Sequence, residues 1–282
     1  MKKKQLILCM GLSAMSLFTS CLSEQKDLDL TPRNESETGK IVLSLNSDAN
    51  FYMQTRALNE ADYRNTNNYT VQLFKGDVSE PEKECRGSES ELQEVFGNLE
   101  LKPGEYTVKA FYGTEEPYSR NNFRVEGSRT FNVGKGTTSQ VEVSCLPTCG
   151  KLTVVFDPTM ATYYDAYNVV YSGAEAFSGK TISWLKADTE PWYVKLKPEG
   201  ETLTYTINVT AKDDYAHVDA NGDKQTTGTV TGQFTLQRNH GHKLTVKPNY
   251  TPTSEGGLQI EIIIDDTLTE HKETIVVPVS WL

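Results

Sequence analysis

Apolar and polar residues alternate with a period of two along most of the chain. The clearest segment is 203–211, where Leu, Tyr, Ile, Val and Ala alternate with Thr and Asn. This period is typical of a strand that has one face in a core and the other in water. Further segments with a similar alternation are 41–45, 69–74, 106–112, 140–145, 152–156, 193–196, 232–236, 244–246, 258–264 and 275–281.

Clusters of Gly, Pro, Asn and Asp separate these segments, and no long stretch shows the period of an amphipathic helix. The sequence therefore predicts an all-β chain with two tandem antiparallel β-sandwich domains. A strand is expected to end at Cys145, Pro147 cannot donate to a ladder, and a new strand starts at Gly150. We expect domains at 39–147 and 148–282. The alternation predicts that Tyr106, Val108, Leu152, Val154, Phe156, Tyr205, Ile207 and Val209 are buried.

The composition supports a substantial core and argues against one class of partner. Of the 282 residues, 37% are hydrophobic and 10% are aromatic, which is typical of a folded globular chain. The 38 acidic and 28 basic residues give a net charge of -10. Because a nucleic-acid partner needs positive charge against its phosphates, we expect no nucleic-acid binding.

A short basic and apolar segment opens the chain. Lys2, Lys3 and Lys4 precede the apolar stretch 6–18, which is shorter than the roughly 20 residues of a membrane-spanning helix. We predict a signal peptide at 1–20. The sequence LFTSC that ends at Cys21 resembles the lipobox of bacterial lipoproteins, which implies an acylated Cys21. The alternative is an ordinary secretory signal in which Cys21 has no role.

Residues 21–38 include five acidic and two basic residues and show no apolar periodicity, so they are expected to form a lipidated tether. This acidic start is similar to the surface-export signals of Bacteroidetes lipoproteins. The resemblance implies an outer-membrane lipoprotein that is exposed at the cell surface.

The order of several short motifs resembles a known family. Cys21, the strand 39–46, the tripeptide Thr-Arg-Ala at 55–57, the strand 69–74 and the sequence LELKPGEYTVKA at 99–110 are similar to Bacteroides fimbrillin-like lipoproteins, and to the DUF4493 family above all. Segments 141–145, 150–156, 228–236 and 244–248 continue the resemblance. It implies two transthyretin-like sandwiches at the cell surface, with like subunits or other pilus components as partners.

The resemblance also implies a processing site. In related fimbrillins a trypsin-like protease cuts at an Arg-Ala or similar bond after the first strand, and the bond that matches here is Arg56–Ala57. Loss of the first strand opens a groove that a strand from a neighbouring subunit can fill. The alternative is that Arg56 is a loop arginine in a protein that keeps its first strand.

Two segments near the C-terminus have the alternating apolar residues that a donor strand needs. Segment 258–264 also carries Ile263 on its other face, which favours a central strand of the second sandwich. In the last segment Pro278 lacks an N–H group, so this strand suits either a sheet edge or a donor. The candidate donor residues are Ile275, Val277, Val279 and Trp281.

The sequence gives no indication of catalysis. It has no Gly-x-Ser-x-Gly motif and no paired-carboxylate context, so we expect neither an enzyme nor a cofactor. The histidines are scattered and the cysteine spacing fits no zinc site, so no metal ligands are expected. Cys9 lies in the predicted signal peptide, so the mature chain would carry Cys85, Cys145 and Cys149 beyond Cys21. Both a Cys145–Cys149 disulfide and free buried thiols are possible.

A second class of function is non-catalytic binding of a host or glycan ligand. Aromatic residues cluster after position 160, and exposed flat rings can stack on sugars. The candidate glycan contacts are Trp184, Trp192 and Tyr193. Core packing explains the same residues, so their exposure distinguishes the two interpretations.

Overall fold

The computed structural model describes residues 37–49, 51, 58–218, 221–249, 259–266 and 271–277. Residues from Ser36 onward form one compact unit. Several predictions fall outside the described residues: the signal peptide, lipidated Cys21, the Arg56–Ala57 bond, and the donor positions Val279 and Trp281.

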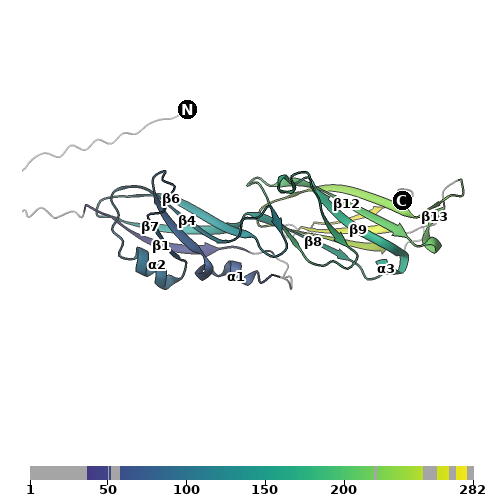
Figure 1. Cartoon of the computed structure of the whole chain (residues 1–282), viewed down its shortest axis with the longest axis horizontal. Helices are drawn as coiled ribbons and strands as arrows, with labels where there is room; N and C mark the ends of the chain where they lie inside the picture. Colours follow the sequence, from purple (N-terminus) through teal and green to yellow (C-terminus); the bar gives the residue numbers. More distant parts are fainter. Residues whose placement is uncertain are drawn as a thin grey trace, which may run out of the picture. The chain divides into compact units, whose positions relative to one another are not determined.

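The first half of this unit is a six-stranded sheet with the order β1-β7-β6-β4-β2-β3 (Figure 1). The strands are β1 (Lys40–Ser47), β2 (Thr70–Lys75), β3 (Lys83–Arg86), β4 (Gly104–Gly113), β6 (Arg124–Val133) and β7 (Thr138–Pro147). The short helices are α1 (Ala61–Arg64), η1 (Thr66–Asn68) and α2 (Glu89–Phe96).

The β6 and β7 strands pair only through Val125 with Pro147 and Glu126 with Leu146 in the described ladder. Farther along, β6 and β7 stay close, because the Ser139 hydroxyl of β7 donates to the Asn132 carbonyl of β6 at 3.0 Å. Inward residues of β1, β7 and β4 share one core, which includes Ile41, Val141 and Val108. The first half is thus a two-layer sandwich made by one curled sheet.

The second half has a four-stranded sheet in the order β10-β9-β12-β15 and a six-stranded sheet in the order β18-β17-β16-β8-β11-β5. The strands are β5 (Tyr118–Ser119), β8 (Cys149–Phe156), β9 (Tyr164–Ser172), β10 (Ile182–Leu185), β11 (Trp192–Lys195), β12 (Glu201–Ala211), β15 (Thr227–Leu236), β16 (Gly241–Asn249), β17 (Gln259–Asp266) and β18 (His271–Val277). Smaller elements are α3 (Met160–Tyr163), η2 (Glu175–Phe177), η3 (Asp213–Tyr215) and the pair β13 (His217–Val218) and β14 (Lys224–Gln225).

The observed strands confirm the predicted all-β class. In β12, Leu203, Tyr205, Ile207 and Val209 are buried on one face, as the alternation requires. Seven of the eight residues predicted to be buried are buried. The exception is Phe156, which is half-buried at the end of β8.

Two pairings correct the expectation of purely antiparallel sheets. β1 runs parallel to β7, and β16 runs parallel to β8. A parallel pair needs a long crossover connection, and in both cases most of one half lies between the two paired strands in sequence. Alternation alone predicts a buried face but not the direction of the neighbouring strand.

The two halves are joined closely. β7 ends at Pro147 and β8 begins at Cys149. In addition, β5 comes from the first half of the chain but pairs with β11 in the second, and Tyr193 of β11 packs in the core of the first half. The domain limits at 147 and 148 therefore stay a prediction, while the described residues on either side share a sheet and a core.

Candidate functional site

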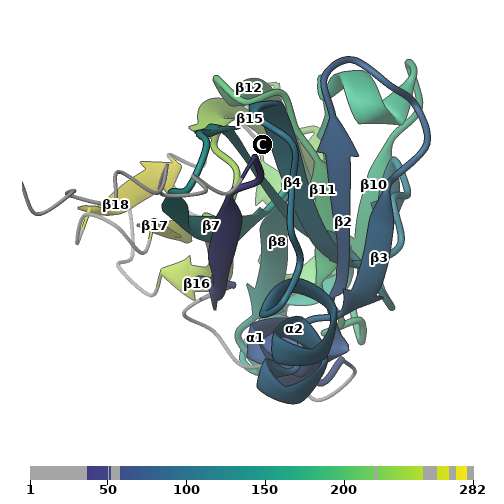
Figure 2. The ribbon, with the colours of Figure 1, turned by 90° about the vertical axis from the view of Figure 1, so that its left-hand side faces the viewer.

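The first strand lies at the edge of its sheet. β1 pairs with β7 from Lys40, opposite Thr138, to Ser47, opposite Cys145, and is the outermost strand in the sheet order. Figure 2 shows β1, in purple, beside β7. Ile41 is 1% exposed, whereas its neighbour Val42 is 50% exposed. One ladder of hydrogen bonds and one apolar face therefore hold β1 in place.

The start of β1 depends on a close approach of the backbone. Gly39 and Leu101 exchange backbone hydrogen bonds of 2.8 and 2.9 Å. A Cβ atom at position 39 would lie 2.4 Å from the carbonyl oxygen of Gly134. A side chain here would therefore push the start of β1 out of position.

A cavity of about 560 Å³ lies beside β1. Consecutive β1 residues from Ile41 to Leu45 line one side, and Leu92 and Phe96 of α2 are on another. Because consecutive residues take part, the cavity follows the backbone of the strand. β1 thus pairs with β7 along one edge and also borders this cavity.

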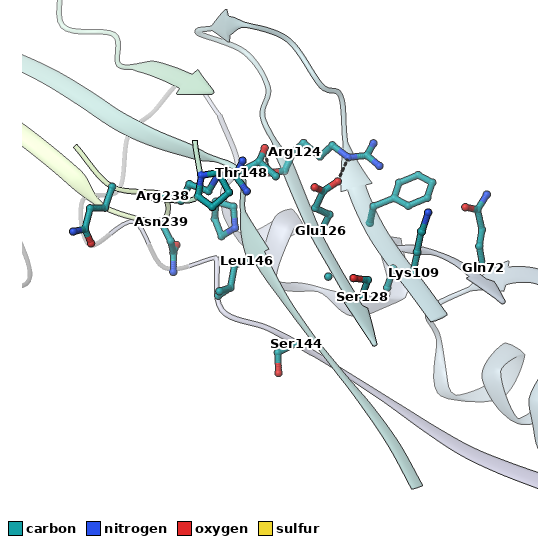
Figure 3. A pocket seen from close by; sticks show the side chains of 16 residues that line it. Gln72, Lys109, Arg124, Glu126, Ser128, Ser144, Leu146, Thr148, Arg238 and Asn239 are labelled. Atoms are coloured by element: carbon teal, nitrogen blue, oxygen red, sulfur yellow. Dashed lines mark hydrogen bonds and ion pairs between the residues drawn. The ribbon is translucent and has the colours of Figure 1, made fainter. Parts of the chain in front are cut away.

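A larger cavity, of about 850 Å³, lies where β4, β6 and β7 approach the turn between β15 and β16 (Figure 3). Lys109, Arg124 and Leu146 from the first half line it together with Arg238 from the second. The Leu146 side chain is 47% exposed. This cavity combines basic groups with apolar surface.

The segment after β1 reaches the joint, which is the region where residues of the two halves contact each other. Phe51 is 4% exposed. Its ring centroid lies 5.2 Å from that of Phe123 and 5.6 Å from that of Tyr193. The first strand is therefore linked in sequence to an aromatic cluster that packs between the halves.

A buried ion pair lies next to this cluster. The Lys151 ammonium is 2.6 Å from Oε1 of Glu60, and the Tyr193 hydroxyl donates to the same oxygen at 2.5 Å. Lys151 is fully buried, and this burial lowers its pKa, although the hydrogen bond that it donates to Glu60 opposes the shift. The contact joins the start of α1 to β8 and β11.

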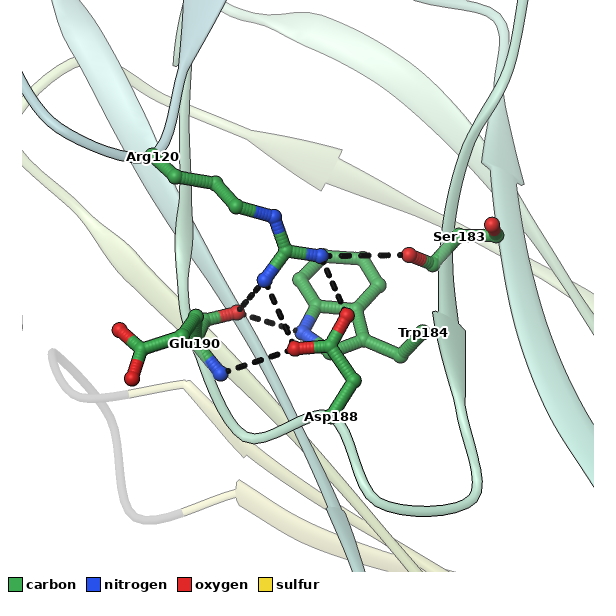
Figure 4. A network of polar contacts seen from close by, with 5 residues as sticks. All are labelled: Arg120, Ser183, Trp184, Asp188 and Glu190. Atoms are coloured by element: carbon green, nitrogen blue, oxygen red, sulfur yellow. Dashed lines mark hydrogen bonds and ion pairs between the residues drawn. The ribbon is translucent and has the colours of Figure 1, made fainter.

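Arg120 makes a second connection between the halves (Figure 4). Its two terminal nitrogens donate to both carboxylate oxygens of Asp188, at 2.8 and 2.5 Å, and one also donates to the Glu190 carbonyl at 2.9 Å. The guanidinium lies 4.5 Å from the centre of the Trp192 ring. Such a planar, bidentate contact fixes the geometry of the loop that follows β10.

The candidate glycan contacts lie in this packed region. Trp184 is fully buried and donates its indole N–H to the Glu190 carbonyl at 2.7 Å, and Tyr193 is 2% exposed. Trp192 is half-buried between Arg120 and Tyr118. Core packing therefore accounts for these rings, because they do not present a pair of exposed faces to a sugar.

The cysteines Cys85, Cys145 and Cys149 are free thiols, which answers the open question about pairing. Burial raises the pKa of Cys145 to about 12. His242 stacks on Phe234 with ring centroids 3.6 Å apart, deep in the second core. In the part of the chain that the structure describes, no three His, Cys, Asp or Glu side chains gather as metal ligands.

Across the same described residues, none of the helices is long and apolar enough to cross a bilayer.

A comparison with protein families decides where the chain belongs. The model of the family described as "Domain of unknown function (DUF4493)" matches residues 37–279. The chain belongs to the DUF4493 family. This result confirms the family that the order of short motifs indicated.

Several solved structures are similar to this DUF4493 chain, all at low identity. A candidate adhesin from Bacteroides ovatus has 9% identity and a TM-score of 0.44, and the match covers 86% of this chain and 95% of that one. A fimbrial assembly protein from Parabacteroides distasonis has 11% identity, a TM-score of 0.41 and coverage of 83% and 97%. The fimbrial anchor protein Mfa2 from Porphyromonas gingivalis has 12% identity, a TM-score of 0.37 and coverage of 84% and 100%. No protein with a curated description matches the sequence.

The sequence did not indicate Glu60, Lys151 or Arg120 as important residues. Glu60 and Lys151 are 91 positions apart, and Arg120 and Asp188 are 68 apart. No local spacing reveals such pairs. The sequence offered one indication: Lys151 is a charged residue in the otherwise mostly apolar strand β8, and a buried charge needs a partner.

Proposed function

We propose that this DUF4493 protein is a structural subunit at the bacterial cell surface, non-catalytic and anchored by lipid on Cys21, that assembles with like subunits by exchanging its first strand. The observation that carries the proposal is the position of β1 at a sheet edge, in a single parallel ladder with β7. The Arg56–Ala57 bond follows β1 in sequence and precedes α1.

Release of β1 has a defined physical consequence. The edge of β7 loses its hydrogen-bonding partner, and the buried contacts of Ile41 are lost from the first core. The unpaired N–H and C=O groups of β7 would then lie beside the apolar surface that β1 had covered, and this combination favours the addition of another strand. A donor needs apolar residues at alternate positions to replace Ile41, Leu43 and Leu45.

The C-terminal strand is the proposed donor. β18 is the outermost strand of its sheet and pairs with β17 in the described ladder. It can therefore leave without breaking a ladder on both sides. Its sequence and the residues after it supply Ile275, Val277, Val279 and Trp281, an alternation long enough to match the three inward residues of β1.

The fimbrial descriptions of two similar structures indicate which kind of partner to test first, namely like subunits or other pilus components. The lipobox resemblance supports a lipid anchor, and the acidic segment after Cys21 supports a location in the outer membrane with the sandwiches at the cell surface.

Limited digestion with trypsin tests the first step. We expect the native protein to be cut after Arg56, and the fragment that carries β1 to separate from the rest on gel filtration. The variant Arg56→Gln should block this cut, whereas Arg129→Gln, an exposed change on β6, should not. First cleavage elsewhere, or a cut fragment that stays bound under native conditions, would contradict the proposal.

A further inference from the structure

The 850 Å³ cavity at the joint has a charge opposite to that of the whole chain. Lys109 on β4, Arg124 on β6 and Arg238 before β16 are its basic residues, and Glu126 is its one acidic residue among the described lining. The Glu126 carboxylate accepts a hydrogen bond of 2.8 Å from Nε of Arg124. The lining thus carries an excess of positive charge in a protein of net charge -10.

Each of these cations is held in place by at least one contact, and Arg124 has a second one besides its hydrogen bond to Glu126. The Arg124 guanidinium lies 4.2 Å from the centre of the Phe111 ring. Nε of Arg238 donates to the Leu196 carbonyl at 2.7 Å. The Lys109 ammonium lies 4.7 Å from the centre of the Phe74 ring. Side chains that are already ordered lose less entropy when a ligand binds.

These contacts leave hydrogen-bond donors available. Within the described residues, the terminal guanidinium nitrogens of Arg124 and Arg238 form no hydrogen bond or ion pair, and neither does the Lys109 ammonium. Figure 3 shows the end of the Arg124 guanidinium directed away from Glu126. Donors of this kind bind a carboxylate through charge-assisted hydrogen bonds.

The rest of the lining narrows the chemistry of the ligand. Ser128, Ser144 and Gln237 supply hydroxyl and amide groups, and Leu146 and Pro198 supply apolar surface. A saccharide offers hydroxyls and apolar C–H faces to such a surface. The cavity volume lies within the range of roughly 300–1,000 Å³ that is usual for ligand sites.

The net negative charge of the chain opposes densely charged polyanions such as nucleic acid. A ligand with one carboxylate per sugar and many hydroxyls matches both the local cations and the polar lining. We infer that this cavity is a binding site for an acidic oligosaccharide built from uronic acids. The site is separate from β1, so this inference does not depend on strand exchange.

Titration calorimetry of the full-length protein with tetragalacturonate tests the inference. Binding should be measurable at moderate salt, and uncharged galacto-oligosaccharides of the same length should bind at least about tenfold more weakly. Arg124→Gln and Arg238→Gln should each reduce affinity about tenfold, the effect expected when a charge-assisted hydrogen bond is removed.

The variant Arg129→Gln is the matched control, since Arg129 is an exposed arginine of β6 outside the cavity. It should bind as the wild type does, and thermal unfolding should show that all three variants remain folded. If Arg124→Gln unfolds, Lys109→Gln takes its place in the comparison. Absence of binding, equal binding of the neutral sugar, equal loss in Arg129→Gln, or equally tight binding of a hexaglutamate peptide would overturn the inference.

Discussion

Lys151 and Glu60 form a buried ion pair across the joint of the two halves, with 2.6 Å between Nζ and Oε1. Glu60 precedes α1 and Lys151 lies on β8, so the contact ties the segment after the first strand to the second sandwich. Phe51 packs against Tyr193, which donates to the same Glu60 oxygen. The polypeptide that leads away from β1 is therefore anchored on both sides of the proposed cleavage bond.

Breaking this pair from one side should destabilise the protein strongly. Lys151→Met leaves a buried carboxylate without its cation, and Glu60→Leu leaves a buried ammonium without its anion. We expect each change to lower the free energy of unfolding by about 3–5 kcal/mol. Urea denaturation of both single variants and the double variant measures the effect.

The double variant should lose much less than the sum of the single losses, because no unpaired charge remains. Additive losses would show that the pair is not coupled. Tyr193→Phe is a milder control, with an expected cost of about 1.5–3 kcal/mol for one hydrogen bond to a charged group.

The two faces of β1 should respond differently to the same substitution. Ile41→Asp places a charge in the first core, where the native side chain is 1% exposed, and should cost about 3 kcal/mol or more. Val42→Asp, at a position that is 50% exposed, should change stability by less than about 0.5 kcal/mol. Urea denaturation provides the comparison. Equal losses would mean that β1 does not pack as described.

His242 should make the second sandwich sensitive to acid. The ring is 2% exposed, and among the side chains that the structure describes its Nε2 has no hydrogen-bond partner. Burial lowers the pKa of His242 to about 3. The unfolded chain takes up a proton near pH 6.5, so stability should be fully present above that pH. It should then fall toward pH 3 by up to about 1.4 kcal/mol per pH unit.

Lowered carboxylate pKa values, such as that of Asp157, also weaken the fold in acid. The measurement is therefore the difference in unfolding free energy between the wild type and His242→Phe, followed from pH 7 to pH 4. As the pH falls, the wild type should lose more unfolding free energy than His242→Phe does. A difference that stays constant would contradict the burial of a neutral His242.

The anchor is tested separately. Metabolic labelling with a radioactive fatty acid should label the wild type and not Cys21→Ala, because the lipobox resemblance implies that Cys21 carries the acyl chain. Cys85→Ala is the matched control and should label normally. Equal labelling of the wild type and Cys21→Ala would contradict the proposed acylation of Cys21.

Strict alternation made β12 and β4 predictable, since β12 buries every second residue from Leu203 to Ala211 and β4 buries Tyr106, Val108 and Ala110. β6 escaped prediction because only Val125 and Val133 of its ten residues are buried. β3 was missed because KECR is short, charged and largely exposed. An alternation of apolar and polar residues indicates a strand only when one face is buried, and β3 and β6 bury too few residues to show this alternation.

The joint could not be predicted for a different reason. The ion pair of Glu60, the bidentate contact of Arg120 and the cavity around Arg124 and Arg238 all bring together residues that are distant in sequence. The parallel pairing of β1 with β7 is likewise a property of the chain path. Tyr193 could be noticed as one of the aromatic residues after position 160, but its burial depends on the first half, whose core it joins.

The central claim is that a neighbour's C-terminal strand replaces β1, and light scattering coupled to gel filtration of the Arg56-cleaved protein tests it most directly. The account predicts that the cleaved chain forms oligomers, that deletion of residues 273–282 leaves it monomeric, and that Val277→Asp weakens assembly more than Thr274→Asp, its counterpart in the alternation. A cleaved, full-length product that stays monomeric at high concentration, or a deletion variant that assembles equally well, would contradict it.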